Sequence, residues 1–317
     1  MRTARKIATV FGGSGFLGRH LVQRLTAAGY IVRIAVRDPE GAKFLRPMGG
    51  IGQVVPLYAP VQDEPACTRA ITGAQAVINL VGILEEAQKG DFTRIHEEGA
   101  GRLARLAAAA GVEKFIQLSA LGADAASPSA YGRSKAAGEA AVRAAFPTAT
   151  ILRPSILFGP EDHFFNRFAA MANLLPVIPI VHGGAKIQPV YAGDVAAAAL
   201  AALAPEAAGR IFELGGPEAL SFRALIELTL GLTGRHRSIL DLPVPLARLQ
   251  AAFLERLPGK LLTNDQISML ARDNVVSPGM PGLADLAIVP TRLALVLPSY
   301  LTRYRAGGRS ENAAFQE

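Results

Sequence analysis

The sequence predicts an α/β fold, with a doubly wound parallel sheet and a smaller, mostly helical C-terminal region. Short apolar runs rich in β-branched residues alternate with stretches of helical period through about the first 160 residues, a pattern typical of a parallel sheet covered on both faces. A glycine-rich segment, GGSGFLG (12–18), lies between the first apolar run and the first helical stretch. With 317 residues, half of them hydrophobic, the chain can bury the large core that such a sheet requires.

Each expected strand is a short apolar run rich in Val and Ile, the type that lies buried inside a parallel sheet. Each expected helix repeats its apolar residues every three or four positions, as Leu17, Leu21 and Leu25 do after the glycine-rich segment. The expected strands are 6–11, 31–37, 76–82, 114–119 and 148–154, and the expected helices begin near residue 15, surround residue 103 and span about 129–145.

The alternation predicts a Rossmann-like domain over residues 1–160, to which later strands near 187–216 return. Residues 161–305 are richer in Pro- and Gly-containing loops, and we expect this region to recognise a substrate or a partner. Two apolar segments in its loops, FFNRF (164–168) and LLPVIPIV (174–181), suit closure over a substrate, docking on a partner or lipid surface, or the core. Residues 306–317 are small and polar, which is typical of a disordered tail.

Composition and charge narrow the classes of function. The net charge of +7 favours anionic partners such as nucleotide phosphates or acidic lipid, whereas the scattered basic residues and the absence of Trp argue against nucleic acid. A single cysteine excludes an internal disulfide, and we predict no metal site. Because no apolar segment is long enough for a transmembrane helix, we expect a cytoplasmic protein that can meet a membrane only at its surface.

Gly12, Gly15 and Gly18 form a G-x-x-G-x-x-G pattern between a strand and a helix, which predicts a dinucleotide site. The first glycine permits the tight turn, the second lets the backbone approach a pyrophosphate, and the third allows the helix to pack closely on the strand. The N-terminus of the helix adds partial positive charge. The cofactor-binding residues expected in this loop are Gly12, Gly13, Ser14, Gly15, Phe16, Leu17 and Gly18.

The end of the second strand indicates which dinucleotide is bound. An NAD site usually has Asp or Glu about 20 residues after the glycines, where it holds the ribose hydroxyls. Here Arg37 stands at that position, and a guanidinium matches a 2′-phosphate bidentately, so NADP(H) is favoured over NAD(H). Asp38 follows directly and keeps NAD(H) as the alternative, while Arg19 and Arg33 are assigned to a solvated surface.

Tyr131 and Lys135, in the segment YGRSK, are four residues apart and therefore share one face of a helix. Beside a nicotinamide ribose, the Lys ammonium can hold the ribose hydroxyls and lower the pKa of the Tyr phenol. A phenol tuned in this way serves as an acid or base for hydride chemistry at a carbonyl. The pair gains specificity because it follows the glycine loop and Ser119 at the end of a strand.

Together these motifs resemble the short-chain dehydrogenase/reductase superfamily, in its extended or atypical branch, over roughly residues 5–230. The matching segments are GGSGFLG, NLVG (79–82), YGRSK, RPSILFGP (153–160) and VYAGDVA (190–196). The resemblance implies that Val81 and Gly82 line the nicotinamide side of the cofactor and that Pro154 lies where the chain passes over it. It also makes Ser119, Tyr131 and Lys135 the catalytic candidates.

The chain departs from this family at two places. Ser119 would orient the substrate, but its spacing to Tyr131 is short for the family, and Ser127 and Ser129 compete for the role. Relatives commonly carry an Asp near the adenine, directly after the third strand of their sheet. In this chain the corresponding segment is LYAPVQD (57–63), which has Ala59 and Pro60 at that place, with Asp63 displaced.

The C-terminal stretch 261–309 resembles one subgroup: the dehydrogenase-like, NADPH-binding accessory subunits of respiratory complex I and their bacterial relatives. LTNDQ, DNVV, GLADL and LPSYLTRYR carry this resemblance. It implies a nucleotide that stays bound without established turnover, at the junction of the peripheral and membrane arms near the quinone site.

We therefore predict an NADP(H)-binding accessory or assembly protein of complex I, peripheral on the cytoplasmic side of the inner membrane. Two alternatives remain open. One is an NADP(H)-dependent oxidoreductase or nucleotide-sugar epimerase/dehydratase that uses Tyr131 and Lys135 on an unidentified carbonyl substrate; the other is a redox sensor.

Overall fold

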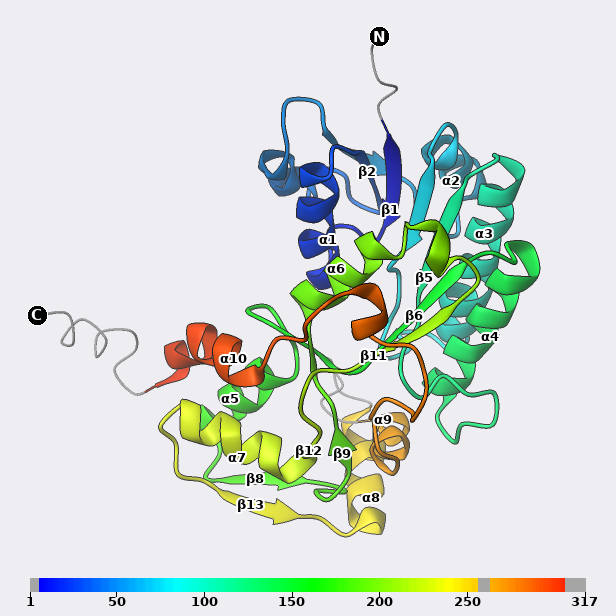
Figure 1. Ribbon diagram of the computed structural model, residues 1–317. Helices are drawn as coiled ribbons and strands as arrows, with labels where there is room; N and C mark the ends of the chain where they lie inside the picture. Colours follow the sequence, from blue (N-terminus) through cyan, green and yellow to red (C-terminus); the bar gives the residue numbers. More distant parts are fainter. Residues whose placement is uncertain (1–5, 256–262, 306–317) are drawn as a thin grey trace, which may run out of the picture. The chain divides into compact units, whose positions relative to one another are not determined.

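The computed structural model describes residues 6–255 and 263–305, and its first part is a Rossmann-like sheet covered by helices (Figure 1). Seven strands pair in the order β11-β6-β5-β4-β1-β2-β3, and every pair is parallel. The order reverses between β1 and β4, as in a doubly wound fold. The predicted fold class is confirmed. The strands are β1 (Ile7–Phe11), β2 (Ile31–Val36), β3 (Val54–Tyr58), β4 (Ala76–Asn79), β5 (Lys114–Leu118), β6 (Thr150–Pro154) and β11 (Ile211–Leu214).

Helices lie on both faces of this sheet. Figure 1 shows α1 (Phe16–Ala27) and α6 (Ala192–Ala201) together on one face, and α2 (Glu64–Ile71), α3 (Ala100–Ala109) and α4 (Ala130–Ala145) on the other. Between the second group and the strands lies a core that includes Phe11, Leu103, Phe115, Val142 and Ile151. Because these side chains are almost completely buried, the carboxyl ends of the strands are held in a fixed arrangement for the site.

The strands and helices predicted for the first half are present, with ends that differ by a few residues. α4 begins after Ser129, whose hydroxyl accepts a hydrogen bond from the Gly132 amide at 3.2 Å. The structure adds further elements to those predicted. Among them are α2, which Asp63 caps by accepting from the Ala66 amide at 2.9 Å, and a π-helical turn, Thr93–Gly99, immediately before α3.

The described chain divides into two compact units. The first comprises the chain up to Pro154 together with Ala192–Leu214 and Ser277–Val289, and the second comprises the segments between and after them. The sequence placed the boundary at residue 160, with strands near 187–216 returning to the first domain. Of the two later segments in the first unit, Ala192–Leu214 lies in that returning region, whereas Ser277–Val289 comes from the part assigned to the C-terminal region. The predicted tail, 306–317, lies outside the described residues.

The second unit is built from helices and three two-stranded sheets, β10-β7, β12-β9 and β13-β8. Its core gathers aromatic side chains, including Phe158, Phe165, Phe222 and Tyr300. Its helices are α5 (Phe165–Leu174), α7 (Phe222–Leu232), α8 (Val244–Leu254), α9 (Asn264–Leu270) and α10 (Leu293–Leu301), and its strands are β7 (Leu157–Phe158), β8 (Val177–Ile180), β9 (Lys186–Ile187), β10 (Val190–Tyr191), β12 (Leu220–Ser221) and β13 (Ser238–Asp241).

The two apolar segments that we expected in loops form α5 and β8 instead. Asp162 accepts hydrogen bonds from the Phe165 and Asn166 amides and so starts α5. FFNRF belongs to the core, because Phe165 is fully buried and its aromatic neighbours pack around it. LLPVIPIV is divided: Ile178 and Ile180 are buried, whereas Leu174 remains 83% exposed. None of the helices in the described ranges has the length and apolar character needed to cross a membrane.

Gly138→Ala is expected to destabilise the protein by about 3 kcal/mol, since the new Cβ would lie 2.1 Å from the carbonyl oxygen of His96. Gly231→Ala in α7 is the matched control, because nothing lies within 4 Å of its Cβ position; it should gain about 0.5–1 kcal/mol. Chemical denaturation of both variants measures the difference. Equal stabilities for the two variants would contradict the close approach of α4 to the π-helical turn.

Candidate functional site

The glycine loop has the geometry that a pyrophosphate site needs. Gly12 has φ +77° and its amide donates to the Ala35 carbonyl at 3.2 Å. A Cβ on Gly18 would lie 2.4 Å from the Gly13 carbonyl oxygen, so only glycine allows α1 to pack here, while a Cβ on Gly15 would meet only the Gly12 oxygen, at 3.3 Å. α1 starts after Gly15 with no side-chain cap and no acidic residue in its first turn. These residues fit a bound dinucleotide phosphate.

The other residues expected in this loop have different surroundings. A Cβ on Gly13 would lie 2.9 Å from the Ile34 side chain, which shows how closely the turn packs on β2. Leu17 is buried in the core, whereas Ser14 and Phe16 are half-buried. The loop therefore offers backbone and the Ser14 hydroxyl to a ligand, and Leu17 serves the packing of α1.

Arg37 is exposed directly after β2, at the position predicted for a 2′-phosphate. The neighbouring Asp38 is part of the following turn: its Oδ1 accepts from the Gly41 amide at 3.0 Å. One carboxylate oxygen of Asp38 is therefore engaged within the protein. No charged group of the described turn opposes the Arg37 guanidinium in an ion pair within 4.0 Å.

The two arginines that we had assigned to a solvated surface both make contacts. Arg33 donates from Nη1 to the carbonyl oxygens of Ala70 at 3.0 Å and Thr72 at 2.6 Å, and so caps the end of α2. Arg19 lies over the Phe44 ring, with 4.8 Å from Cζ to the centroid, and its Nε donates to the Ser14 carbonyl at 3.4 Å. Arg19 therefore lies beside the glycine loop.

The adenine end also differs from the family pattern in the structure. Ala59 is buried immediately after β3, and Asp63 uses its Oδ1 as the cap of α2. The displaced Asp63 is thus explained by helix capping, and the chain provides no acidic residue at Ala59 or Pro60 for an adenine contact.

Tyr131 and Lys135 lie one turn apart on α4. Lys135 is buried, its Nζ donates to the Leu118 carbonyl at 2.8 Å, and burial lowers its pKa to about 8 against the opposing effect of Glu139. The expected lowering of the Tyr131 pKa by Lys135 is not found: burial raises this pKa to about 12. The phenol therefore stays protonated at neutral pH, the form that can donate a proton.

The loop after β4 brings the glycine turn and Lys135 together. A Cβ on Gly12 would lie 3.3 Å from Val81 Cγ2, and a Cβ on Gly82 would lie 3.9 Å from Lys135 Nζ. Asn79 holds this loop by accepting from the Val81 amide at 3.1 Å and donating to Gln117 at 2.9 Å. Pro154 ends β6, which pairs with β5, and its carbonyl accepts from the Leu121 amide at 2.9 Å.

Ser119 takes part in a buried network that sequence reasoning missed. Its hydroxyl donates to Glu139, whose carboxylate also accepts from Arg153 Nε at 2.9 Å and Nη2 at 2.7 Å. Arg153 Nη1 lies 3.5 Å from the Glu213 carboxylate on the neighbouring strand. The proton of Ser119 is therefore directed to Glu139 in this arrangement, and not toward a substrate carbonyl.

The two competing serines have structural contacts as well. Ser129 caps α4, and Ser127 Oγ accepts from the Ser129 amide at 3.3 Å. A Cβ on Gly132 would lie 2.5 Å from Ser127 Oγ, so Ser127 is packed closely against the first turn of α4.

His96 is the other site residue that the sequence did not reveal. It is 2% exposed, its Nε2 accepts from the Ile83 amide at 3.0 Å, and its Nδ1 lies 2.8 Å from Ser134 Oγ. Because Ser134 donates to the Tyr131 carbonyl at 2.8 Å, His96 carries its proton on Nδ1. Its ring meets the Tyr131 ring edge-on at 5.6 Å. The only sequence signal was a lone histidine after NLVG, which by itself has no pattern.

The comparisons with known proteins agree with this geometry. A family model described as "NAD dependent epimerase/dehydratase family" matches residues 8–215. The chain belongs to this family. A solved short-chain dehydrogenase/reductase superfamily protein from Agrobacterium tumefaciens, with bound NAD, superposes with a TM-score of 0.60 at 25% identity and covers 74% of this chain and 85% of that one.

Two curated relatives extend the family assignment. The NADH dehydrogenase (ubiquinone) 1 alpha subcomplex subunit 9 of Arabidopsis thaliana, a mitochondrial protein, is 37% identical over 98% of this chain and 81% of its own length. A ceramide reductase from Caulobacter vibrioides is 34% identical over 61% of this chain and 60% of its own length. The first of these relatives is similar through the second unit as well as the first.

His96 should make the protein acid-sensitive. Burial and the nearby Lys135 lower its pKa to about 3, against 6.5 for an unperturbed histidine. The unfolded chain therefore binds a proton below about pH 6.5 that the folded chain does not, and folded-state stability falls as the pH decreases. At about pH 4.5 this loss should reach about 2.5 kcal/mol relative to neutral pH.

Denaturation of the wild type and His96→Gln at both pH values measures this loss, and the variant should lose about that much less. His163→Gln, at an exposed histidine, is the control and should keep the wild-type loss. An unchanged pH dependence in His96→Gln would show that His96 is not the group responsible.

Proposed function

We propose that this chain is an accessory or assembly subunit of respiratory complex I (NADH:ubiquinone oxidoreductase) that holds NADP(H) mainly as a structural component. One observation carries this proposal: the similarity to a complex I subunit spans 98% of the chain, including the residues after 215 that the family model does not reach. A generic dehydrogenase gives no reason for similarity in that part.

The glycine loop, Arg37 and Lys135 are the residues that would hold the nucleotide. The open backbone at Gly15 and the uncapped start of α1 suit the pyrophosphate, and the exposed Arg37 suits a 2′-phosphate, so NADP(H) is favoured over NAD(H). The bound group supplies hydride chemistry where a substrate is present. A ligand held only by the folded state also stabilises it by mass action, by about 2.7 kcal/mol at a hundredfold excess over the dissociation constant.

The surroundings of Ser119 support a structural role for the nucleotide. Tyr131 and Lys135 are placed for ribose contacts. The Ser119 hydroxyl, which would polarise a substrate carbonyl, instead donates its hydrogen bond to Glu139. A site of this kind can bind and orient a dinucleotide without completing a substrate-reducing arrangement.

The second candidate function is an NADP(H)-dependent oxidoreductase. It is favoured by the Tyr131–Lys135 pair on α4 and by the similarity to a relative named a ceramide reductase. In that case the protonated Tyr131 would deliver the proton and Lys135 would hold the ribose.

We infer that the partners are complex I subunits at the junction of the peripheral and membrane arms, on the cytoplasmic side of the inner membrane. Nucleic acid is not expected as a partner, because the basic residues are scattered along the chain. The similarity to complex I relatives supports complex I subunits as the partners.

Arg37→Asp should lower the affinity for NADPH by about a hundredfold and that for NADH much less, since it removes charge-assisted hydrogen bonds to the 2′-phosphate. Isothermal titration with each nucleotide measures both constants. Arg46→Asp, an equal charge change at an exposed residue after β2, is the control. A parallel loss for NADPH and NADH would point to a collapsed loop and contradict the assignment.

Tyr131→Phe should leave complex I assembly and activity unchanged, because it removes the acid and keeps the ring packed against His96. Arg37→Asp should lower the amount of assembled complex. The measurement is a pull-down of the tagged chain from native membranes, with partners and bound nucleotide identified. A free protein that oxidises NADPH with a carbonyl substrate, and loses this activity in Tyr131→Phe, would overturn the structural role in favour of the enzyme.

A further inference from the structure

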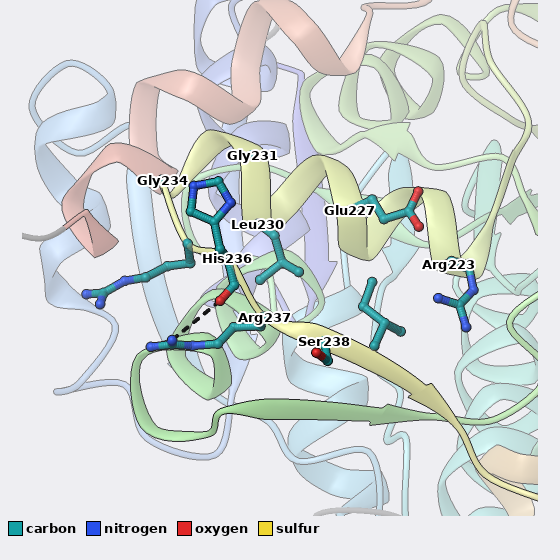
Figure 2. Close-up of a pocket in the computed structure, with 10 residues that line it drawn as sticks. Arg223, Glu227, Leu230, Gly231, Gly234, His236, Arg237 and Ser238 are labelled. Carbon is teal, nitrogen blue, oxygen red and sulfur yellow. Dashed lines mark hydrogen bonds between the residues drawn. The ribbon is translucent and has the colours of Figure 1, made fainter.

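The second unit contains a basic cavity that the proposed function does not use. It has a volume of about 720 Å³ and lies between α7 and β13 (Figure 2). This volume is typical of small-molecule sites, which span about 300–1,000 Å³. Among the described residues that line it, the cations Arg223, Arg235 and Arg237 and the imidazole of His236 face a single carboxylate, that of Glu227.

The arginines of this cavity are unequally neutralised. Arg223 pairs with Asp241 at 2.6 Å, and Figure 2 shows it at the opposite end of the cavity from Arg237. Arg237 donates to the carbonyl oxygens of Ala172 at 2.9 Å and His236 at 3.5 Å. No carboxylate of the described chain lies within 4.0 Å of Arg237 or Arg235, so this end of the cavity keeps two positive charges.

Arg235 has an unused donor. Its Nη2 makes one long hydrogen bond, 3.4 Å, to the Tyr304 carbonyl. Its Nε is buried and has no hydrogen-bond partner. No other buried side-chain nitrogen or oxygen atom of the described residues lacks one. Because this Nε is closed to solvent, a ligand in the cavity would meet Arg235 through its Nη groups. A guanidinium presents its N–H groups in a plane that matches two oxygens of a phosphate.

Two aliphatic side chains, Leu230 and Ile239, line the cavity, and further exposed aliphatic residues lie close by on β13, β8 and α5. Leu240 lies two residues after Ser238 on β13, hence on the same face of the strand, and is 53% exposed. Val177 pairs with Ser238 in the β13-β8 sheet and is 39% exposed, and Leu174 precedes it at the end of α5. A ligand bound by the arginines would therefore have apolar surface beside its charged group.

We propose that this cavity binds the phosphate group of an anionic ligand, with Arg235 and Arg237 as its principal contacts. The shared chemistry is a phosphate mono- or diester, supplied either by the headgroup of an anionic phospholipid or by a free phosphate compound. Glu227 opposes this charge from α7 and weakens binding, which gives the site a residue whose removal strengthens it.

The test uses the full chain with inorganic phosphate, titrated by calorimetry in the presence of excess NADPH. Arg235→Gln should weaken phosphate binding by about tenfold, the loss of one charge-assisted hydrogen bond. Glu227→Gln should strengthen it by about threefold. Arg248→Gln on α8, which removes the same charge at an exposed residue outside the cavity, should leave it unchanged.

Sedimentation with phosphatidylcholine vesicles that contain phosphatidylglycerol distinguishes the two sources. Loss of both phosphate and vesicle binding in Arg235→Gln identifies a lipid headgroup, and loss of phosphate binding alone identifies a free phosphate compound. If Arg235→Gln does not fold, the gain in Glu227→Gln still decides, since misfolding does not tighten binding.

The proposal is overturned if Arg235→Gln and Glu227→Gln bind phosphate like the wild type, or if Arg248→Gln weakens binding as much as Arg235→Gln does. These variants leave the glycine loop and Arg37 intact, so a negative result here is independent of whether the chain belongs to complex I or carries NADP(H).

Discussion

A buried carboxylate, Glu139, joins the helix that carries Tyr131 and Lys135 to the sheet beneath it. Its oxygens accept from Arg153 on β6 and from Ser119 at the end of β5. Separating such a buried pair leaves an uncompensated charge, which is strongly unfavourable. The pair therefore holds α4 in one position along the strands, and Lys135, one turn before Glu139, is held beside the Leu118 carbonyl.

Around this fixed helix, the site is assembled by backbone segments that approach more closely than any side chain would permit. Gly18 meets Gly13 within the first turn, and Gly138 brings α4 against the carbonyl of His96. The first contact fixes the glycine loop, and the second fixes α4 against the π-helical turn. The candidate cofactor site is thus shaped mainly by close packing of backbone. Its few polar side chains lie on segments whose positions this packing fixes.

This construction separates binding from chemistry. Under the proposed function, Tyr131 and Lys135 would contact the ribose whether or not a substrate is turned over, while the Ser119 hydroxyl donates its hydrogen bond to Glu139. A fold that gains stability from a bound nucleotide has reason to keep such a site. The second unit adds an aromatic core and the basic cavity.

Local patterns were enough for the parallel sheet, the glycine loop and the helix with Tyr131 and Lys135, because these depend on periodicity and on spacings of a few residues. Local patterns could not predict contacts between residues that are distant in the sequence. Ser134 meets His96 across 38 residues of sequence, and Glu139 meets Arg153 across 14, so neither pair has a sequence signature. Arg33 likewise turned out to cap α2, a helix that was itself not predicted.

The apolar segments at 164–168 and 174–181 show the same limit. Their composition was compatible with a loop, a docking surface and the core, and only packing against Phe222, far along the chain, placed the phenylalanines inside. The basic cavity is likewise formed where α7 and β13 approach each other. Periodicity along the chain determines which helices and strands form. Which of their side chains are exposed to a ligand is decided by burial and pairing, because these depend on residues that only the folded chain brings together.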